Sequence, residues 1–199
     1  MPAELREAWL QAAVGHLRRD FVRAGVPLPA GIQVSVGFPS SRRRGVIGEC
    51  WSKRAAADGQ FNIFISPQID AAVEVLGVLT HELVHAADDC RSGHRGRFGR
   101  LARAVGLVGP LTSTSTGPEL LARLNALARF LGPYPHGAIN RLKLGTKAQT
   151  TRLIEVQCPH CGYIVRTTDK WLSVGLPRCP QGQEMIPGSK EMETACLTT

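Results

Sequence analysis

The stretch IDAAVEVLGVLTHELVHAA, from Ile69 to Ala87, decides how this 199-residue chain folds. It is apolar on most sides, which predicts a helix at about 68–90, buried at the centre of a domain. The run His81-Glu82-Leu83-Val84-His85 stands near the end of this helix. Because residues four apart share one face of a helix, both imidazoles can reach one metal ion, and Glu82 can lean over its open side.

An H-E-x-x-H run is typical of zinc hydrolases, in which the Glu acts as general base on the attacking water. Catalytic zinc takes three protein ligands and keeps one position open. Asp88 and Arg91 stand where a metzincin would have Gly and His, and a Glu ligand would have to be the distant Glu119. His94 is the better third ligand, because Gly93 can break the helix and turn the chain back.

The segment around His94 reads Gly93-His94-Arg95-x-x-Phe98. Together with H-E-x-x-H, it resembles the SprT-like metalloproteases, the group that includes Spartan-type DNA–protein crosslink proteases. That family has a second Gly where this chain has Arg95. The resemblance covers about residues 30–185, including Val46–Trp51, Asn62–Pro67, Gly132–His136 and the region of Cys158, and it is closest to bacterial and phage members. It implies a zinc-dependent endopeptidase that acts on DNA-bound or DNA-crosslinked proteins.

The expected fold is α+β: a zincin-like metalloprotease domain, in which a small sheet packs on the metal helix, with a C-terminal zinc-ribbon-like appendage. We expect the protease domain at 1–131, a connector at 132–151 and the ribbon at 152–199. Within the protease domain, hydrophobic periodicity predicts helices at 3–24, 98–105 and 119–131, and strands at 32–36, 46–51 and 61–65.

Two local features of this domain are also predicted. Ser66 and Pro67 suit the N-cap and first position of the metal helix. The strand Phe61–Ile65 is expected at the edge of the sheet beside the cleft, where a peptide substrate could pair with it through backbone hydrogen bonds. Backbone pairing ignores side chains, so cleavage would tolerate many sequences.

The C-terminal segment contains Cys158-Pro159-His160-Cys161-Gly162 between two predicted strands, 153–157 and 163–167, and Cys179 follows. These cysteines make up most of a zinc ribbon, with Cys158, Cys161 and Cys179 as ligands of a second, structural zinc ion. A structural site needs four ligands, and the fourth is left open between His160, Cys196 and water. A redox C-x-x-C pair is the rival interpretation, but no thioredoxin-like pattern surrounds it.

The chain carries 24 Lys and Arg against 16 Asp and Glu, a net charge of +8. This balance favours an acidic partner, and DNA is the first candidate. Local clusters support nucleic-acid contact, with the candidate residues Arg42, Arg43, Arg44, Arg95 and Arg97.

Several interpretations stay open from the sequence. Tyr134 and His136 either form a rigid turn or reach the cleft and stabilise an oxyanion. Asp88 is either an acceptor for a ligand imidazole or a solvated carboxylate. Cys50 and Cys90 are expected to be reduced thiols rather than a disulfide, since no signal peptide or membrane span is predicted and the protein is expected in the cytoplasm.

The main rival function is a nucleic-acid-associated zinc-binding module without protease activity. The intact Glu82 argues against it, because purely structural zinc has no use for a base. Hydrolysis of another bond, such as that in a small amide, is a third possibility. The sequence does not indicate the oligomeric state.

Overall fold

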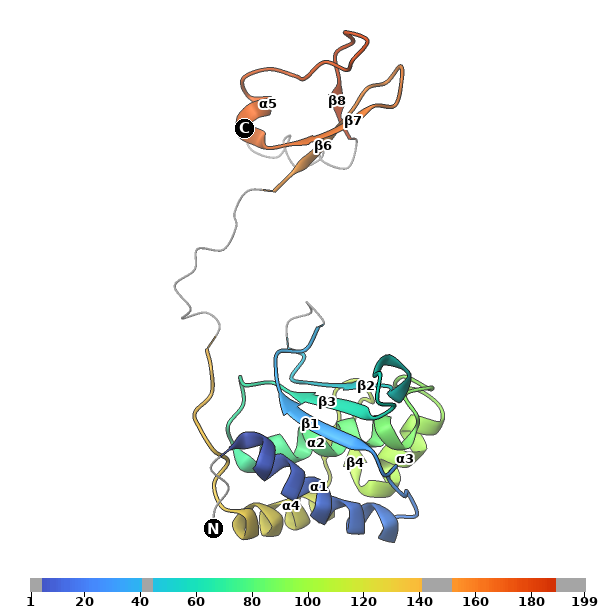
Figure 1. Cartoon of the computed structure of the whole chain (residues 1–199), viewed down its shortest axis with the longest axis vertical. Coiled ribbons are helices and arrows are strands. Elements are labelled where there is room, and N and C mark those ends of the chain that lie inside the picture. Colours follow the sequence, from blue (N-terminus) through green and yellow to red (C-terminus); the bar gives the residue numbers. More distant parts are fainter. Residues whose placement is uncertain (1–4, 41–44, 141–151, 189–199) are drawn as a thin grey trace. The chain divides into compact units, whose positions relative to one another are not determined.

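The computed structural model describes residues 5–40, 45–140 and 152–188. The chain divides into two compact units, residues 1–143 and 144–199, each of which is described by itself (Figure 1). Both contain helices and small sheets, so the predicted α+β class is confirmed. None of the described helices is long and apolar enough to cross a membrane.

The first unit is built on a three-stranded sheet of β1 (Ile32–Val36), β2 (Gly48–Trp51) and β3 (Phe61–Ile65). The strand order is β1-β3-β2, with β1 parallel and β2 antiparallel to β3. In β3, Phe61, Ile63 and Ile65 are buried and the residues between them are only partly so. This period-two burial is typical of a strand with one face on the core, and the strand predicted at 61–65 is confirmed.

The prediction that Phe61–Ile65 is the edge strand is wrong, because β3 lies between the other two strands. β2 is the edge strand on the side of the cleft, and its second edge pairs with no strand among the described residues. The reason is topological: the chain visits both outer positions before it inserts β3. Hydrophobic alternation places a residue on one face of a strand but does not say which strands are its neighbours.

The described residues of this unit also form four α-helices and a hairpin. They are α1 (Arg6–Arg23), α2 (Ala72–Ala87), α3 (Arg97–Val105) and α4 (Pro118–Leu131), with a short 3-10 helix η1 (Lys53–Ala55) and the strands β4 (Leu107–Val108) and β5 (Ser115–Thr116). Figure 1 shows α1, α2 and α4 on one side of the sheet. The core side chains of α2 are completely or almost completely buried, as the sequence predicted: Val75, Leu76, Leu79, Leu83 and Val84.

The metal helix α2 is shorter than predicted at both ends. Ser66 does not cap it; its hydroxyl accepts a hydrogen bond from the Gln68 amide, within a separate turn. The helix begins only at Ala72. It ends at Ala87 because Asp89 and Cys90 adopt left-handed backbone angles, with φ of 56° and 53°.

Residues 132–140, which the sequence assigned to a connector, belong to the first unit instead. The guanidinium of Arg6 donates to the carbonyls of Pro135 (2.9 Å) and Gly137 (2.6 Å). The amide of Ile139 donates to the carbonyl of Pro67 at 2.8 Å. A Pro-rich composition indicated a linker, but these bonds from α1 and from the start of the metal-helix segment hold it in place. The rest of the predicted connector, 141–151, lies outside the described residues.

The second unit is a small antiparallel sheet in the order β7-β6-β8, formed by β6 (Ile154–Gln157), β7 (Ile164–Thr167) and β8 (Ile186–Pro187), with the one-turn helix α5 (Asp169–Leu172). The two strands predicted around the C-x-x-C run are confirmed. Within residues 152–188, the buried side chains are Val156, Met185, Cys158 and Cys179. Two of these four are candidate metal ligands, so the core is too small to rest on apolar packing alone.

Candidate metal centre

Three imidazoles meet at the end of α2. His81 and His85 lie one turn apart on the helix, and His94 reaches them from the following turn. Its Nε2 lies 3.2 Å from Nε2 of His81 and 3.1 Å from Nε2 of His85. Ligands bound tetrahedrally at 2.0–2.1 Å would be about 3.3 Å apart. The three predicted ligands therefore form one group that could hold a metal ion.

The turn that brings back His94 is fixed by Asp88. This carboxylate is fully buried and accepts hydrogen bonds from the Ser92 amide (2.7 Å) and hydroxyl (3.0 Å). The guanidinium of Arg97 lies 3.9 Å from it. Of the two interpretations that the sequence left open, neither describes Asp88. It is not solvated, and its hydrogen-bond partners are in the turn, which it closes.

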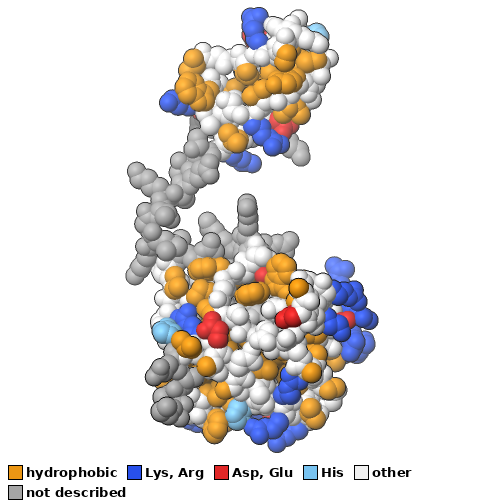
Figure 2. Space-filling view, in the orientation of Figure 1, with side chains coloured by type: hydrophobic (Ala, Val, Ile, Leu, Met, Phe, Trp, Pro, Cys, Tyr) orange, Lys and Arg blue, Asp and Glu red, His pale blue; other side chains and the backbone are white. Residues whose placement is uncertain are grey.

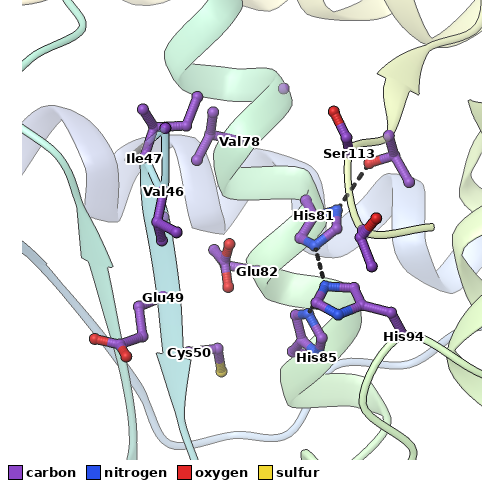
Figure 3. A pocket seen from close by; sticks show the side chains of 15 residues that line it. Val46, Ile47, Glu49, Cys50, Val78, His81, Glu82, His85, His94 and Ser113 are labelled. Carbon is purple, nitrogen blue, oxygen red and sulfur yellow. Dashed lines mark hydrogen bonds between the residues drawn. The ribbon is translucent and has the colours of Figure 1, made fainter. Parts of the chain in front are cut away.

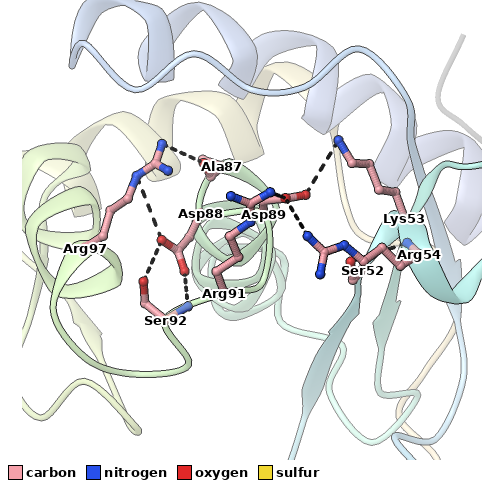
Figure 4. A network of polar contacts seen from close by, with 9 residues as sticks. All are labelled: Ser52, Lys53, Arg54, Ala87, Asp88, Asp89, Arg91, Ser92 and Arg97. Atoms are coloured by element: carbon pink, nitrogen blue, oxygen red, sulfur yellow. Dashed lines mark hydrogen bonds and ion pairs between the residues drawn. The ribbon is translucent and has the colours of Figure 1, made fainter.

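The neighbouring Asp89 lies among cations. Its carboxylate lies 2.8 Å from the guanidinium of Arg91, 3.7 Å from the ammonium of Lys53 and 3.9 Å from the guanidinium of Arg54 (Figure 4). These ion pairs join the end of α2 to η1, which follows β2 directly. They hold the turn against the edge strand of the sheet.

The ring of Phe98 lies against all three imidazoles. Its centroid is 4.3 Å from that of His85, 5.1 Å from that of His94 and 5.2 Å from that of His81, and its side chain is fully buried. Phe98 was identified from the sequence only as part of a motif. In the structure it supports the three rings and excludes solvent from one side of them.

A contact that the sequence did not reveal orients His81. Its Nδ1 lies 2.8 Å from the hydroxyl of Thr114, in the loop between β4 and β5. When Nδ1–H donates to this hydroxyl, the lone pair is on Nε2, which faces the other two imidazoles. The sequence between 109 and 118 is rich in Ser and Thr, but this composition does not indicate which hydroxyl reaches His81.

A pocket of about 390 Å³ opens beside these groups (Figure 3). β2 and the residues before it form one wall, and the 112–114 loop contributes to the other; Figure 3 shows Glu82 between β2 and the imidazole rings. Glu82 is only 6% exposed. Gly48 faces it so closely that an added Cβ would lie 2.6 Å from the carboxylate Oε1. The full lining consists of Gly45, Val46, Ile47, Gly48, Glu49, Cys50, Gly77, Val78, His81, Glu82, His85, His94, Thr112, Ser113 and Thr114.

Burial sets the protonation of these groups. It lowers the pKa of His81 to about 4 and that of His85 to about 3, with smaller effects from the neighbouring imidazoles, and it also lowers the pKa of His94. The imidazoles are therefore neutral near pH 7, as metal ligands must be. Burial raises the pKa of Glu82 to about 8, helped by the charges of Cys90 and Glu49. A cation held by the three imidazoles would lower that pKa again.

Tyr134 and His136 do not line the pocket. Tyr134 is buried, with its ring centroid 5.1 Å from that of Trp9 and 5.4 Å from the guanidinium carbon of Arg6, and burial raises its pKa to about 12. His136 is exposed, with a left-handed φ of 65°. Of the two interpretations left open, these positions favour the rigid turn, which is held to α1 by Arg6.

The candidate nucleic-acid contacts are placed only in part. Arg42, Arg43 and Arg44 lie outside the described residues. Arg95 and Arg97 are exposed on the segment that carries His94. Figure 2 shows Lys and Arg side chains gathered at one side of the first unit, around the position of η1 in Figure 1.

The second unit brings together Cys158, Cys161 and Cys179, whose sulfur atoms all lie within 4.8 Å of one another. The amide of Gly162 donates to the Cys158 carbonyl at 3.0 Å, which closes the predicted knuckle. This group could also hold a metal ion. Of the candidate fourth ligands, His160 is not a member of the group, and Cys196 lies outside the described residues.

A second tight turn follows Cys179, where the amide of Gly182 donates to the Cys179 carbonyl at 2.8 Å. Gly182 has a φ of 80° and occupies the place, three residues after Cys179, that Cys161 occupies after Cys158. The chain thus also turns tightly after Cys179, but it has a glycine where a C-x-x-C run would have its second thiol.

Comparison with known proteins gives no match: no protein-family model, curated protein or solved structure is significantly similar to this chain. The SprT-like resemblance therefore stays a prediction that rests on the motifs.

Proposed function

We propose that this chain is a zinc-dependent endopeptidase that acts on proteins bound or crosslinked to DNA. The observation that carries the proposal is the joint placement of three neutral imidazoles and one buried carboxylate at the same pocket. A structural metal site is closed by four ligands, whereas this one offers three ligands and a cavity of about 390 Å³.

His81, His85 and His94 would hold the zinc ion, and the chemistry of the donor set suits it, because neutral imidazole nitrogens are among its usual ligands. When bound, zinc supplies a Lewis acid that activates water and polarises a carbonyl group. Thr114 can accept the Nδ1 proton of His81, which leaves the lone pair on Nε2 for the metal, and Phe98 lies against the rings. Both contacts hold the imidazole rings in place before a metal ion binds, so the rings lose less conformational entropy on binding.

Glu82 is the general base in this proposal. It accepts a proton from the attacking water and delivers it to the amine that leaves. Its burial excludes bulk water and raises its pKa. A cation bound nearby would lower that pKa again. The absence of a side chain at Gly48 leaves the space that the carboxylate occupies.

The substrate would bind along β2. This strand lines the pocket through Gly48, Glu49 and Cys50 and is the edge strand on that side of the sheet. An extended peptide can pair with a free strand edge through main-chain hydrogen bonds alone. The proposal therefore replaces the predicted strand, β3, by β2, and it keeps the expectation that cleavage depends little on sequence.

Cations close to the pocket support the link to DNA. Lys53, Arg54, Arg91, Arg95 and Arg97 are exposed around the end of α2 and the segment that follows. Asp88 and Asp89 neutralise only part of this charge. Phosphate contacts of this kind release counterions, so DNA binding would weaken steeply with salt.

The test is incubation of the zinc-loaded chain with a basic DNA-binding protein, with and without DNA, beside Glu82→Gln. Wild type should cleave the substrate, and faster with DNA. Glu82→Gln should keep its zinc but lose at least a hundredfold in turnover, because an amide cannot accept the proton. Glu74→Gln is the matched control: it lies on the same helix but is exposed and does not line the pocket.

Equal turnover by wild type and Glu82→Gln would overturn the assignment of the base. If wild type cleaves no protein but still binds DNA and zinc, the alternative holds: a nucleic-acid-associated zinc-binding module without protease activity.

A further inference from the structure

Two thiols outside the metal groups lie side by side. Cys50, from β2, and Cys90, from the turn after α2, are 40 residues apart in the chain, and their sulfur atoms are 3.6 Å apart. Cys90 Sγ also lies 3.8 Å from the carbonyl oxygen of Cys50, to which it donates. Both side chains are half-buried, and Cys50 lines the pocket.

The backbone of β2 and that of the turn after α2 both place these two thiols close together. Cys50 shares a face of β2 with Gly48, whose position abuts Glu82, so its thiol is directed toward α2. Cys90 has a left-handed φ of 53°, and its amide donates to the carbonyl of His85 at 2.9 Å. The ion pairs of Asp89 with Lys53 and Arg54 hold this turn against the segment that follows β2.

We propose that Cys50 and Cys90 form a reversible disulfide, a redox modification site that joins the edge strand to the turn leading from His85 to His94. The inference does not depend on peptidase activity. It differs from the sequence-based expectation of two independent reduced thiols in that these two are placed to react with each other.

A small-molecule disulfide such as oxidised glutathione supplies the oxidising equivalents. Cys90 thiolate attacks one glutathione sulfur, and the other glutathione leaves as a thiolate and takes up a proton. Cys50 then loses its proton and attacks the Cys90 sulfur, which releases the second glutathione. The two protein thiols are oxidised to one disulfide, and one oxidised glutathione is reduced to two molecules of glutathione.

The hydrogen bond between the thiols distinguishes their roles. It lowers the pKa of Cys90, which acts as acceptor in its thiolate form, and it raises the pKa of Cys50 together with burial. The more acidic Cys90 therefore supplies the first nucleophile. The sulfur atoms need to approach by only about 1.5 Å, since a disulfide bond is about 2.05 Å long.

The experiment titrates the full, zinc-loaded chain with mixtures of reduced and oxidised glutathione, followed by rapid alkylation and a non-reducing tryptic map. Cleavage after Arg44, Lys53, Arg54 and Arg91 releases residues 45–53, with Cys50, and residues 55–91, with Cys90. These two peptides should be linked in the oxidised protein and separate after reduction. The map keeps this link distinct from any that involves Cys158, Cys161, Cys179 or Cys196.

Thermal unfolding is the second readout. A bond that closes a loop of this length should raise the melting temperature of the unit formed by residues 1–143 by roughly 5–15 °C. Cys50→Ser and Cys90→Ser should each abolish both the linked peptide and this rise. The proposal is overturned if the linked peptides are missing from fully oxidised wild type, or if Cys50→Ser shows the same rise.

Discussion

Thr114 contributes a single hydrogen bond, which holds the His81 ring with its Nε2 facing the other imidazoles. We predict that Thr114→Val lowers zinc affinity by about 10- to 100-fold, because the ring then loses its fixed tautomer and orientation. Competition with a chromophoric chelator measures the change. Thr112→Val is the matched control, since Thr112 lines the same pocket and is exposed. Equal affinities in the two variants would refute the role of Thr114.

The raised pKa of Glu82 predicts that the stability of the metal-free protein depends on pH. This pKa is about 8 in the folded chain and near its usual 4.5 when unfolded, so the folded state binds more protons between these values. The contribution of this proton to the free energy of unfolding is fully present below pH 4.5 and is lost as the pH rises through 8. Relative to Glu82→Gln, metal-free wild type should lose about 2 kcal/mol of unfolding free energy between roughly pH 6.5 and 9.

Denaturant unfolding of both proteins, after treatment with a chelator, tests this difference. The window lies above the range in which His81 and His85 titrate, because their lowered pKa values affect stability only as the pH falls below 6.5. Zinc should shrink the difference between wild type and variant, since a nearby cation stabilises the carboxylate. A difference that is constant with pH in the metal-free proteins would contradict the raised pKa.

The residues of the metal group differ in how far the sequence could reveal them. His81, Glu82 and His85 follow from a helical spacing that is local and exact. His94 needed the extra inference of a turn, which the structure builds from Asp88 and two left-handed residues rather than from Gly93 alone. Thr114 could not be found, because its contact arises from a hairpin 33 residues further along the chain.

At the scale of the elements, β2 and α2 approach each other so closely that Gly48 has no room for a side chain. A Cβ there would lie 2.6 Å from Glu82 Oε1 and 2.6 Å from Val78 Cγ1. We predict that Gly48→Ala displaces the carboxylate and lowers turnover at least tenfold while zinc is retained, at a stability cost of about 1–3 kcal/mol. Turnover, zinc content and unfolding free energy are measured together.

Gly15→Ala serves as the control for this substitution. Gly15 lies inside α1, and an added Cβ meets no heavy atom within 4 Å. The change should raise stability by about 0.5–1 kcal/mol, since alanine restricts the unfolded chain more than glycine does, and it should leave turnover unchanged. If Gly48→Ala behaved in the same way, the close approach of β2 to Glu82 would have no functional importance.

Most helices and strands could be predicted from the sequence, but which of them lie side by side could not. The apolar residues of single segments located β3, α2 and α4, because burial along one segment leaves a pattern in its own sequence. The order of the strands depends on where other segments pack, so β3 was wrongly expected at the edge. Ser66 and Pro67 have the composition of a helix start, but Ser66 instead hydrogen-bonds Ile47 and closes its own turn.

At the scale of the whole molecule, the chain forms two compact units, each with its own candidate metal group. We predict two zinc ions per chain, and one after Cys158→Ser. Among the described residues of the second unit, four form the buried core and two of them are Cys158 and Cys179, so its folding should depend on metal. The variant should therefore lose the unfolding transition of residues 152–188 and keep that of the first unit.

Metal analysis and differential scanning calorimetry measure these effects, with Cys50→Ser as the control that should keep both zinc ions. A second unit that stays folded in Cys158→Ser, or after complete removal of zinc, would reject the ribbon.

The boundary between the units shows what composition can and cannot indicate. Proline and glycine after residue 131 favoured a connector up to 151, whereas the two compact units divide between residues 143 and 144. Arg6, far away in the sequence, determines that residues 132–140 belong to the first unit, because it binds two of their carbonyls. Long-range bonds of this kind leave no periodic trace in the sequence.

The contact between His81 and the 112–114 loop has a thermodynamic consequence for the molecule as a whole. The loop lines the pocket, so a pocket ligand and a metal ion would both act on the same hydrogen bond. Linkage is reciprocal: if the metal strengthens the binding of a pocket ligand by some factor, the ligand strengthens the binding of the metal by that factor. Such a protein would bind its metal most tightly while the pocket holds a ligand and would release the metal most readily while the pocket is empty.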